Sequence, residues 1–136
     1  REARMLKQQT QTESMDCVSL TEELYAYRCK GAVCVELLEA NMMANAVVER
    51  FNLAVEELIQ QHKGADIVLD LQHVQWMCSL MLGKLVAMAK YARAHSTRIL
   101  LAGLSAQLQS IIRVTKLTDI LPMFDDVNTA LRRRTG

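Results

Sequence analysis

One hydroxyl group in this chain lies where phosphate chemistry is physically favoured. Ser79 follows the apolar run at residues 67–71 after a short turn, and it opens a segment with helical spacing. The first turn of a helix carries unpaired backbone N–H groups and a partial positive charge, which would stabilise a phosphoserine. An unmodified serine at the same point would simply cap the helix. The sequence therefore offers two roles for Ser79, a phosphorylation site and an N-cap.

Patterns for catalysis or metal binding are weak in the rest of the chain. His62, His73 and His95 are far apart and lack metal-ligand spacing, so we expect exposed loop histidines and no metal site. Adjacent carboxylates such as Asp125 and Asp126 do not face each other across a cleft as a catalytic pair must. Neither a G-x-S-x-G frame nor a glycine-rich phosphate loop occurs. We therefore predict a protein that is not an enzyme and has no cofactor.

Length and charge restrict the class of partner. The chain has 136 residues with 51% hydrophobic content, enough for one domain with its own core. Sixteen Lys and Arg against fifteen Asp and Glu give a net charge of +1, which supplies no general attraction for nucleic acid or acidic membranes. No apolar run approaches the roughly 18 residues that span a bilayer, and the polar start has no signal-peptide core. We expect a cytoplasmic protein that binds other proteins.

The elements that must position Ser79 alternate between strands and helices. Residues 1–20 are expected to be an N-terminal extension, flexible or helical, and residues 21–136 a single domain. The expected elements are a hairpin at 24–29 and 33–38, a helix at 45–63, a strand at 67–71, a helix at 79–95, a strand at 98–101, a helix from a Ser105 cap to 116, a strand at 121–124 and a last helix capped by Asp125 or Asp126. This order, ββαβαβαβα, predicts an α/β fold with a mixed central sheet of about five strands and about four helices.

Three segments in this order carry a family resemblance. They are the strand and turn I-V-L-D-L to W-M-C-S-L-M-L-G-K-L, the strand R-I-L-L-A-G-L-S, and the C-terminal V-T-K-L-T-D-I-L-P-M-F-D-D-V-N-T-A-L. Together they resemble the STAS domain of bacterial anti-sigma-factor antagonists, over residues 24–131. The resemblance implies a STAS-like fold.

In that family the turn commonly reads Asp-Ser-Ser-Gly-Leu-Gly, and a partner kinase phosphorylates the first serine. The resemblance places this serine on Ser79. Cys78 replaces the family aspartate, which removes a charge and a strong hydrogen-bond acceptor beside the hydroxyl. The remaining positions fall on Leu80, Met81 and the pair Leu82-Gly83.

The resemblance also implies a partner and a mechanism. The unmodified domain docks its second helix on an anti-sigma factor, a serine kinase of the histidine-kinase-like ATPase type, and displaces the sigma factor. Phosphorylation adds about two negative charges to that contact and weakens it. The chain is then a monomer or weak homodimer that regulates transcription, for example in a stress response.

Helical geometry predicts which residues face the partner. With Leu82, Leu85, Val86 and Ala89 turned to the core, the rest of the helix forms an apolar outer face. The loop before the first long helix is expected to approach the same site in this fold. The predicted partner-binding residues are Cys78, Leu80, Met81, Lys84, Ala87, Met88, Tyr91, Asn41 and Met42.

Other interpretations remain open at this point. The outer face could contact the N-terminal segment, and the methionines before the first helix could form a hydrophobic staple. The domain could be a scaffold or oligomer subunit of a stress-signalling complex that is never phosphorylated, consistent with Cys78. It could also be a sensor that holds a small anion or a lipid at the N-terminus of the second helix.

Overall fold

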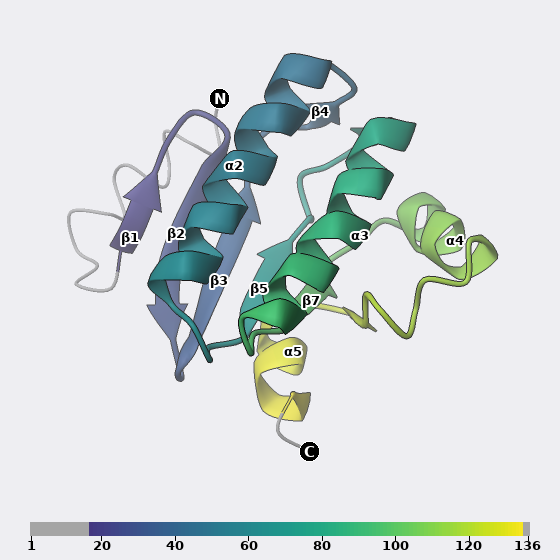
Figure 1. The fold of residues 1–136 in the computed structure, drawn as a ribbon. Coiled ribbons are helices and arrows are strands. Elements are labelled where there is room, and N and C mark those ends of the chain that lie inside the picture. Colours follow the sequence, from purple (N-terminus) through teal and green to yellow (C-terminus); the bar gives the residue numbers. More distant parts are fainter. Residues whose placement is uncertain (1–16, 135–136) are drawn as a thin grey trace.

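The computed structural model describes residues 17–134, which form a six-stranded mixed sheet with helices on both faces and a separate two-stranded sheet (Figure 1). The α/β architecture and the alternation of strands and helices are as predicted. The strands are β1 (Cys17–Leu20), β2 (Leu24–Cys29), β3 (Ala32–Leu37), β4 (Asn41–Met42), β5 (Ile67–Asp70), β6 (Trp76–Met77), β7 (Ile99–Ala102) and β8 (Met123–Phe124), and the helices are α2 (Asn45–Gln61), α3 (Ser79–Ala94), α4 (Ala106–Val114) and α5 (Val127–Arg133).

The main sheet has the order β1-β2-β3-β5-β7-β8. β2 pairs antiparallel with β1 and β3, and the hairpin between β2 and β3 turns at Lys30 and Gly31, whose φ values are 53° and 80°. β3, β5, β7 and β8 are parallel. Parallel neighbours require crossover connections, and here α2, α3 and α4 supply them.

The sheet has six strands where the sequence predicted about five. The additional strand is β1, which pairs with the free edge of β2 and lies inside the segment expected to be an extension. Its sequence, C-V-S-L, lacks the nearly continuous apolar run that marks β5 and β7, so only the pairing reveals it. Residues 1–16 of the predicted extension lie outside the described residues.

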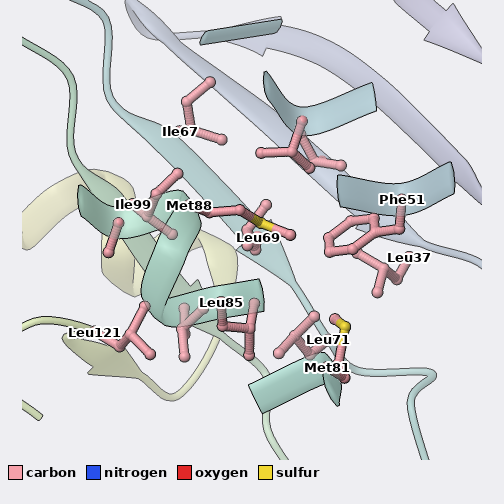
Figure 2. Close-up of a cluster of buried hydrophobic side chains, with 14 of the residues drawn as sticks. Leu37, Phe51, Ile67, Leu69, Leu71, Met81, Leu85, Met88, Ile99 and Leu121 are labelled. Carbon is pink, nitrogen blue, oxygen red and sulfur yellow. The ribbon is translucent and has the colours of Figure 1, made fainter. Parts of the chain in front are cut away.

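The sheet is buried on both faces by different helices. α2 and α3 cover one face, where the side chains of Phe51, Leu69 and Met88 meet in the larger core (Figures 1 and 2). α5 covers part of the other face with Ala130 and Leu131. Every residue of β3 and β5 is buried, as expected for central strands between two layers.

Two helix caps confirm predictions from the sequence. Ser105 is the N-cap of α4, and its Oγ accepts a hydrogen bond from the backbone N of Leu108 at 3.2 Å. Asp126 caps α5, and its Oδ1 accepts from the backbone N of Thr129 at 2.7 Å. Capping satisfies backbone N–H groups that have no partner inside the helix. These two bonds fix where the last two helices begin.

Asp66 joins three elements at the end of the sheet where β5 begins. Arg98 donates to both of its carboxylate oxygens, at 3.1 and 2.9 Å, and Arg134 Nη1 donates to Oδ2 at 2.9 Å. Burial by itself would raise the pKa of Asp66, but the hydrogen bonds and charges of the two arginines hold it below its ordinary value. The carboxylate therefore ties the starts of β5 and β7 to the end of α5.

Asp66→Asn tests this junction. A lowered pKa in the folded state stabilises the fold above the unfolded pKa of about 4, and that stabilisation is lost as the pH falls through the folded value. We expect the substitution to lower the free energy of unfolding by about 1 kcal/mol at pH 7. The difference from wild type should shrink below pH 4 in urea denaturation. Asp125→Asn, at an exposed position, is the control. If Asp66→Asn lowered the free energy of unfolding by the same amount at pH 7 and below pH 4, the role of the Asp66 charge would be contradicted.

Candidate functional site

Ser79 is the first residue of α3, and its side chain is exposed. The N-cap of the helix is Cys78, which has extended backbone angles (φ −91°, ψ 170°) and makes no side-chain capping bond. The prediction that Ser79 is the N-cap is therefore wrong. A residue that is already helical does not occupy the cap position, from which a hydroxyl reaches the N–H groups of the next turn. The Ser79 hydroxyl is presented to solvent instead.

A small second sheet places the loop before α2 beside this turn. β4 pairs parallel with β6, with Asn41 opposite Trp76 and Met42 opposite Met77. The backbone N of Cys78 also donates to the carbonyl of Met42 at 3.3 Å. The expected approach of this loop to the Ser79 turn is confirmed, and backbone hydrogen bonds hold the two segments together.

Two large apolar side chains are exposed at this place. Trp76 is 55% exposed and Met43 is 51% exposed. Asn41 lies with them, and its Oδ1 accepts from the backbone N of Met43 at 3.0 Å, which fixes the bend after β4. We call Asn41, Met43, Trp76 and Ser79 the Ser79 surface. Exposed apolar side chains that lie together are typical of protein-binding sites.

Sequence reasoning missed Trp76 as a surface residue. The only signal was the position of the chain's single tryptophan three residues before Ser79. Such a residue is as easily interpreted as part of the core, since tryptophan is mostly buried on average. The pairing of β4 with β6 decides that its ring points outward.

The prediction that Met81 and Met88 flank an exposed face is wrong. Both are 0% exposed, and both lie among core side chains such as Leu69 and Leu85 (Figure 2). Met42, also predicted to bind a partner, is 0% exposed as well. None of these three side chains is available to a partner in this structure.

The error is one of helix rotation. α3 turns Met81, Leu85, Met88, Ala89 and Ala92 to the core, a pattern of i, i+4, i+7, i+8 and i+11. Leu85 and Ala89 are therefore buried as predicted. The predicted core residues Leu82 and Val86 are half-buried and pack at the margin of the same cluster.

Two other predicted partner residues face α2. Lys84 Nζ lies 3.1 Å from Glu49 Oε1, and the hydroxyl of Tyr91 accepts a hydrogen bond from Gln60 Nε2. The ring of Tyr91 also packs on His95 with 4.4 Å between centroids. Both side chains are half-buried, so their main contacts lie inside the domain. Of the remaining predicted residues, Asn41 and Ala87 are exposed, whereas Cys78 and Leu80 are half-buried.

A hydrogen bond between His73 and the buried Glu36 anchors the loop that leads to Ser79. His73 Nε2 lies 2.6 Å from Oε2 of Glu36, whose side chain is buried at the end of β3. Beside them, both carboxylate oxygens of Asp70 accept hydrogen bonds from Gln72 at 3.1 and 2.6 Å, and burial raises the pKa of Asp70. The expectation of exposed histidines is thus wrong, because His62, His73 and His95 are all half-buried.

These carboxylates also give the adjoining cavity its charge. A cavity of about 510 Å³ lies between the sheet and the start of α5, lined by Glu36, Asp70, Asp125 and Asp126 among others. An anion would be repelled there. This cavity lies at the start of α5 and not at the N-terminus of α3, so its charge does not bear on the anion sensor predicted there.

The sequence model of the STAS domain matches residues 27–130, most of the chain. The chain belongs to the STAS domain family. The match spans the fold from β2 to α5, including β4, β6 and the Ser79 turn. No match was found among curated protein sequences. Within the described residues, no helix is both long enough and apolar enough to cross a membrane.

Solved structures share this STAS fold at low sequence identity. An anti-sigma-factor antagonist domain protein from Planctomyces limnophilus aligns with a TM-score of 0.72 at 14% identity, covering 83% of this chain and 98% of that one. An anti-sigma factor antagonist from Mycobacterium paratuberculosis aligns at 0.71 and 15%, covering 83% and 93%. The Bacillus cell fate determinant SpoIIAA in its phosphorylated form aligns at 0.63 and 15%, covering 82% and 98%.

Met88→Ala tests the orientation of α3. Removing a fully buried methionine side chain loses apolar burial and leaves a cavity, so we expect the free energy of unfolding to fall by about 2 to 5 kcal/mol. Lys90→Ala, at an exposed position on the same helix, should change it by about 0.5 kcal/mol or less. Urea denaturation measures both. If Met88→Ala behaved like Lys90→Ala, the burial of Met88 would be refuted.

Proposed function

We propose that this STAS domain is a protein-interaction switch of the anti-sigma-factor-antagonist type, controlled by phosphorylation of Ser79. Its family and the described functions of structurally similar proteins support the general role. The observation that carries the proposal is an exposed hydroxyl at the first position of a 16-residue helix, beside exposed Trp76 and Met43. The domain is then a substrate of its partner and not itself a catalyst.

Phosphate at this position is compatible with the fold. The N–H groups of the first turn of α3 and the helix dipole both favour negative charge at Ser79. The first turn contains no acidic side chain that would repel a phosphate. The replacement of the family aspartate by Cys78 removes one further source of repulsion. Modification would therefore change the surface while leaving the helix in place.

The effect on a partner follows from what surrounds the serine. A partner that covers Trp76 and Met43 must also bring its own surface close to Ser79. About two added negative charges would then have to be desolvated within the contact, which weakens the complex. Burial of apolar side chains stabilises the complex, and the desolvation of a charged phosphate on Ser79 offsets that stabilisation.

The proposed partner is an anti-sigma factor that is also a serine kinase of the histidine-kinase-like ATPase type. Binding of the unmodified domain would release a sigma factor in the cytoplasm of a bacterium, and phosphorylation would reverse this. The same partner thus recognises the surface and modifies it, because the kinase must bind Ser79 in order to phosphorylate it.

A scaffold role is the second candidate, and one observation favours it. The half-buried thiol of Cys78 offers a kinase no carboxylate next to the hydroxyl, while the exposed Trp76 and Met43 would still bind a second protein. In that case the domain would be a constant subunit of a stress-signalling complex, and Ser79 would carry no phosphate.

Ser79 variants separate the two candidates. We expect mass spectrometry of the protein from its own host to show one phosphate on Ser79, absent from Ser79→Ala. With the purified kinase partner, Ser79→Ala should bind like the wild type. Ser79→Asp should bind about tenfold more weakly, because it adds a charge to the contact. Absence of phosphate under growth and stress conditions, with equal binding by both variants, would overturn the switch and leave the scaffold role.

Trp76→Ala tests the binding surface itself. A tryptophan at the centre of an interface contributes strongly to affinity, so truncation should weaken partner binding by about tenfold or more. Leu53→Ala is the matched control, because Leu53 is 62% exposed on α2, away from β4 and β6. Calorimetric titration of the purified partner compares them. Equal affinities for the two variants would place the interface elsewhere on the domain.

A further inference from the structure

A basic cavity lies at the end of the sheet opposite the Ser79 surface. It has a volume of about 610 Å³ and is formed by the turn between β2 and β3 together with the loop between α2 and β5. Arg28 and Lys30 line it from the hairpin, and His62 and Lys63 line it from the end of α2. We call this cavity the basic pocket. Its size is within the range of small-molecule binding sites.

The positive charge of the basic pocket is not balanced within the described chain. None of its lining residues is acidic. Arg28, Lys30 and Lys63 are exposed and form no ion pair with a described residue. The carboxylate of Asp66, the last residue of this loop, is already shared by Arg98 and Arg134. Three cations around one cavity repel one another, and an anion between them would remove that repulsion.

Helix electrostatics explain only half of this arrangement. His62 and Lys63 follow the C-terminus of α2, where positive charge complements the helix dipole. Arg28 and Lys30 belong to the β2–β3 hairpin and not to α2. Stabilisation of α2 therefore does not explain why these two hairpin residues line the same cavity as Lys63.

The walls of the pocket are held in place from behind. Arg134 Nη2 donates to the carbonyl of Lys30 and so connects the hairpin turn to the end of α5. On the other wall, the backbone N of Gly64 donates to Thr97 Oγ1 at 3.1 Å, and that of Val33 donates to the Asp66 carbonyl at 2.9 Å. A site whose backbone is already ordered loses less entropy when a ligand binds.

We propose that the basic pocket binds a phosphate-bearing anion, as a site separate from the Ser79 surface. Arginine and lysine form charge-assisted hydrogen bonds to phosphate oxygens, and a phosphorylated compound or a phosphorylated lipid headgroup could supply them. The site does not depend on the proposed switch, because it uses none of the residues of the Ser79 surface.

Amide NMR of the whole chain with inorganic pyrophosphate tests the proposal. We expect saturable shifts at residues 28–33 and 62–65, and no such shifts in sodium chloride of the same ionic strength. Shifts that also occur in sodium chloride, or that centre on the start of α3, would overturn it. The affinity should fall as salt is added, since the lining charges are exposed.

Charge-removing variants confirm the location. Lys30→Gln with Lys63→Gln should weaken pyrophosphate binding by about tenfold or more, because each lysine supplies a charged hydrogen bond. Lys90→Gln, an exposed lysine outside the pocket, should bind like the wild type. Arg28→Gln is a single alternative if the double variant does not fold. Equal affinity for all these proteins would refute the site.

Vesicle sedimentation distinguishes the two sources of phosphate. Phosphatidylcholine vesicles with and without phosphatidylinositol phosphate are compared for the wild type and the double variant. Binding that needs the phosphorylated lipid and is lost in the variant supports a headgroup ligand. Pyrophosphate binding without vesicle binding supports a free phosphorylated compound. The site would be overturned if the double variant still bound the vesicles and the wild type did not bind pyrophosphate.

Discussion

β5 lies between β3 and β7 and pairs in parallel with both, so its burial sets the register of the central sheet. All four residues of β5 are buried, so the strand cannot shift its register without moving apolar side chains out of both cores. The chain leaves this strand at Asp70 and reaches α3 nine residues later. The position of the Ser79 turn therefore depends on a strand that is buried along its whole length. The Glu36–His73 contact and the pairing of β4 with β6 fix the segment between this strand and α3.

The two ends of the sheet differ in charge although the chain as a whole is nearly neutral. Carboxylates gather where the parallel strands end, with Glu36 and Asp70 buried beside a cavity. Cationic side chains gather where those strands begin, around the basic pocket. The net charge of +1 sums both ends of the sheet, so it does not reveal that one end is acidic and the other basic. A switch at one end and an anion site at the other can then operate without sharing residues.

α3 shows why a helix can be predicted correctly while its exposed face is predicted wrongly. The helix was predicted at its observed start, but its apolar residues lie on nearly all sides, so several rotations bury a similar area. The predicted rotation left Met81 and Met88 outside, and the sheet and α2 selected the rotation that buries them. A helix with one clear apolar stripe, such as α2, does not have this ambiguity: Val48, Phe51, Val55, Leu58 and Ile59 are buried as its spacing predicts.

Local sequence patterns predicted the alternation of strands and helices, the β2–β3 hairpin, the Ser105 cap, and the serine at the start of α3. These features depend on local spacing and on residue types that act over a few positions, which a sequence displays directly. Tertiary structure alone decided that β1 joins the sheet, that Trp76 and Met43 are exposed, and that Arg28 and Lys63 share one cavity. Each of these depends on contacts between segments distant in the chain, and such contacts leave no periodic signal in either segment.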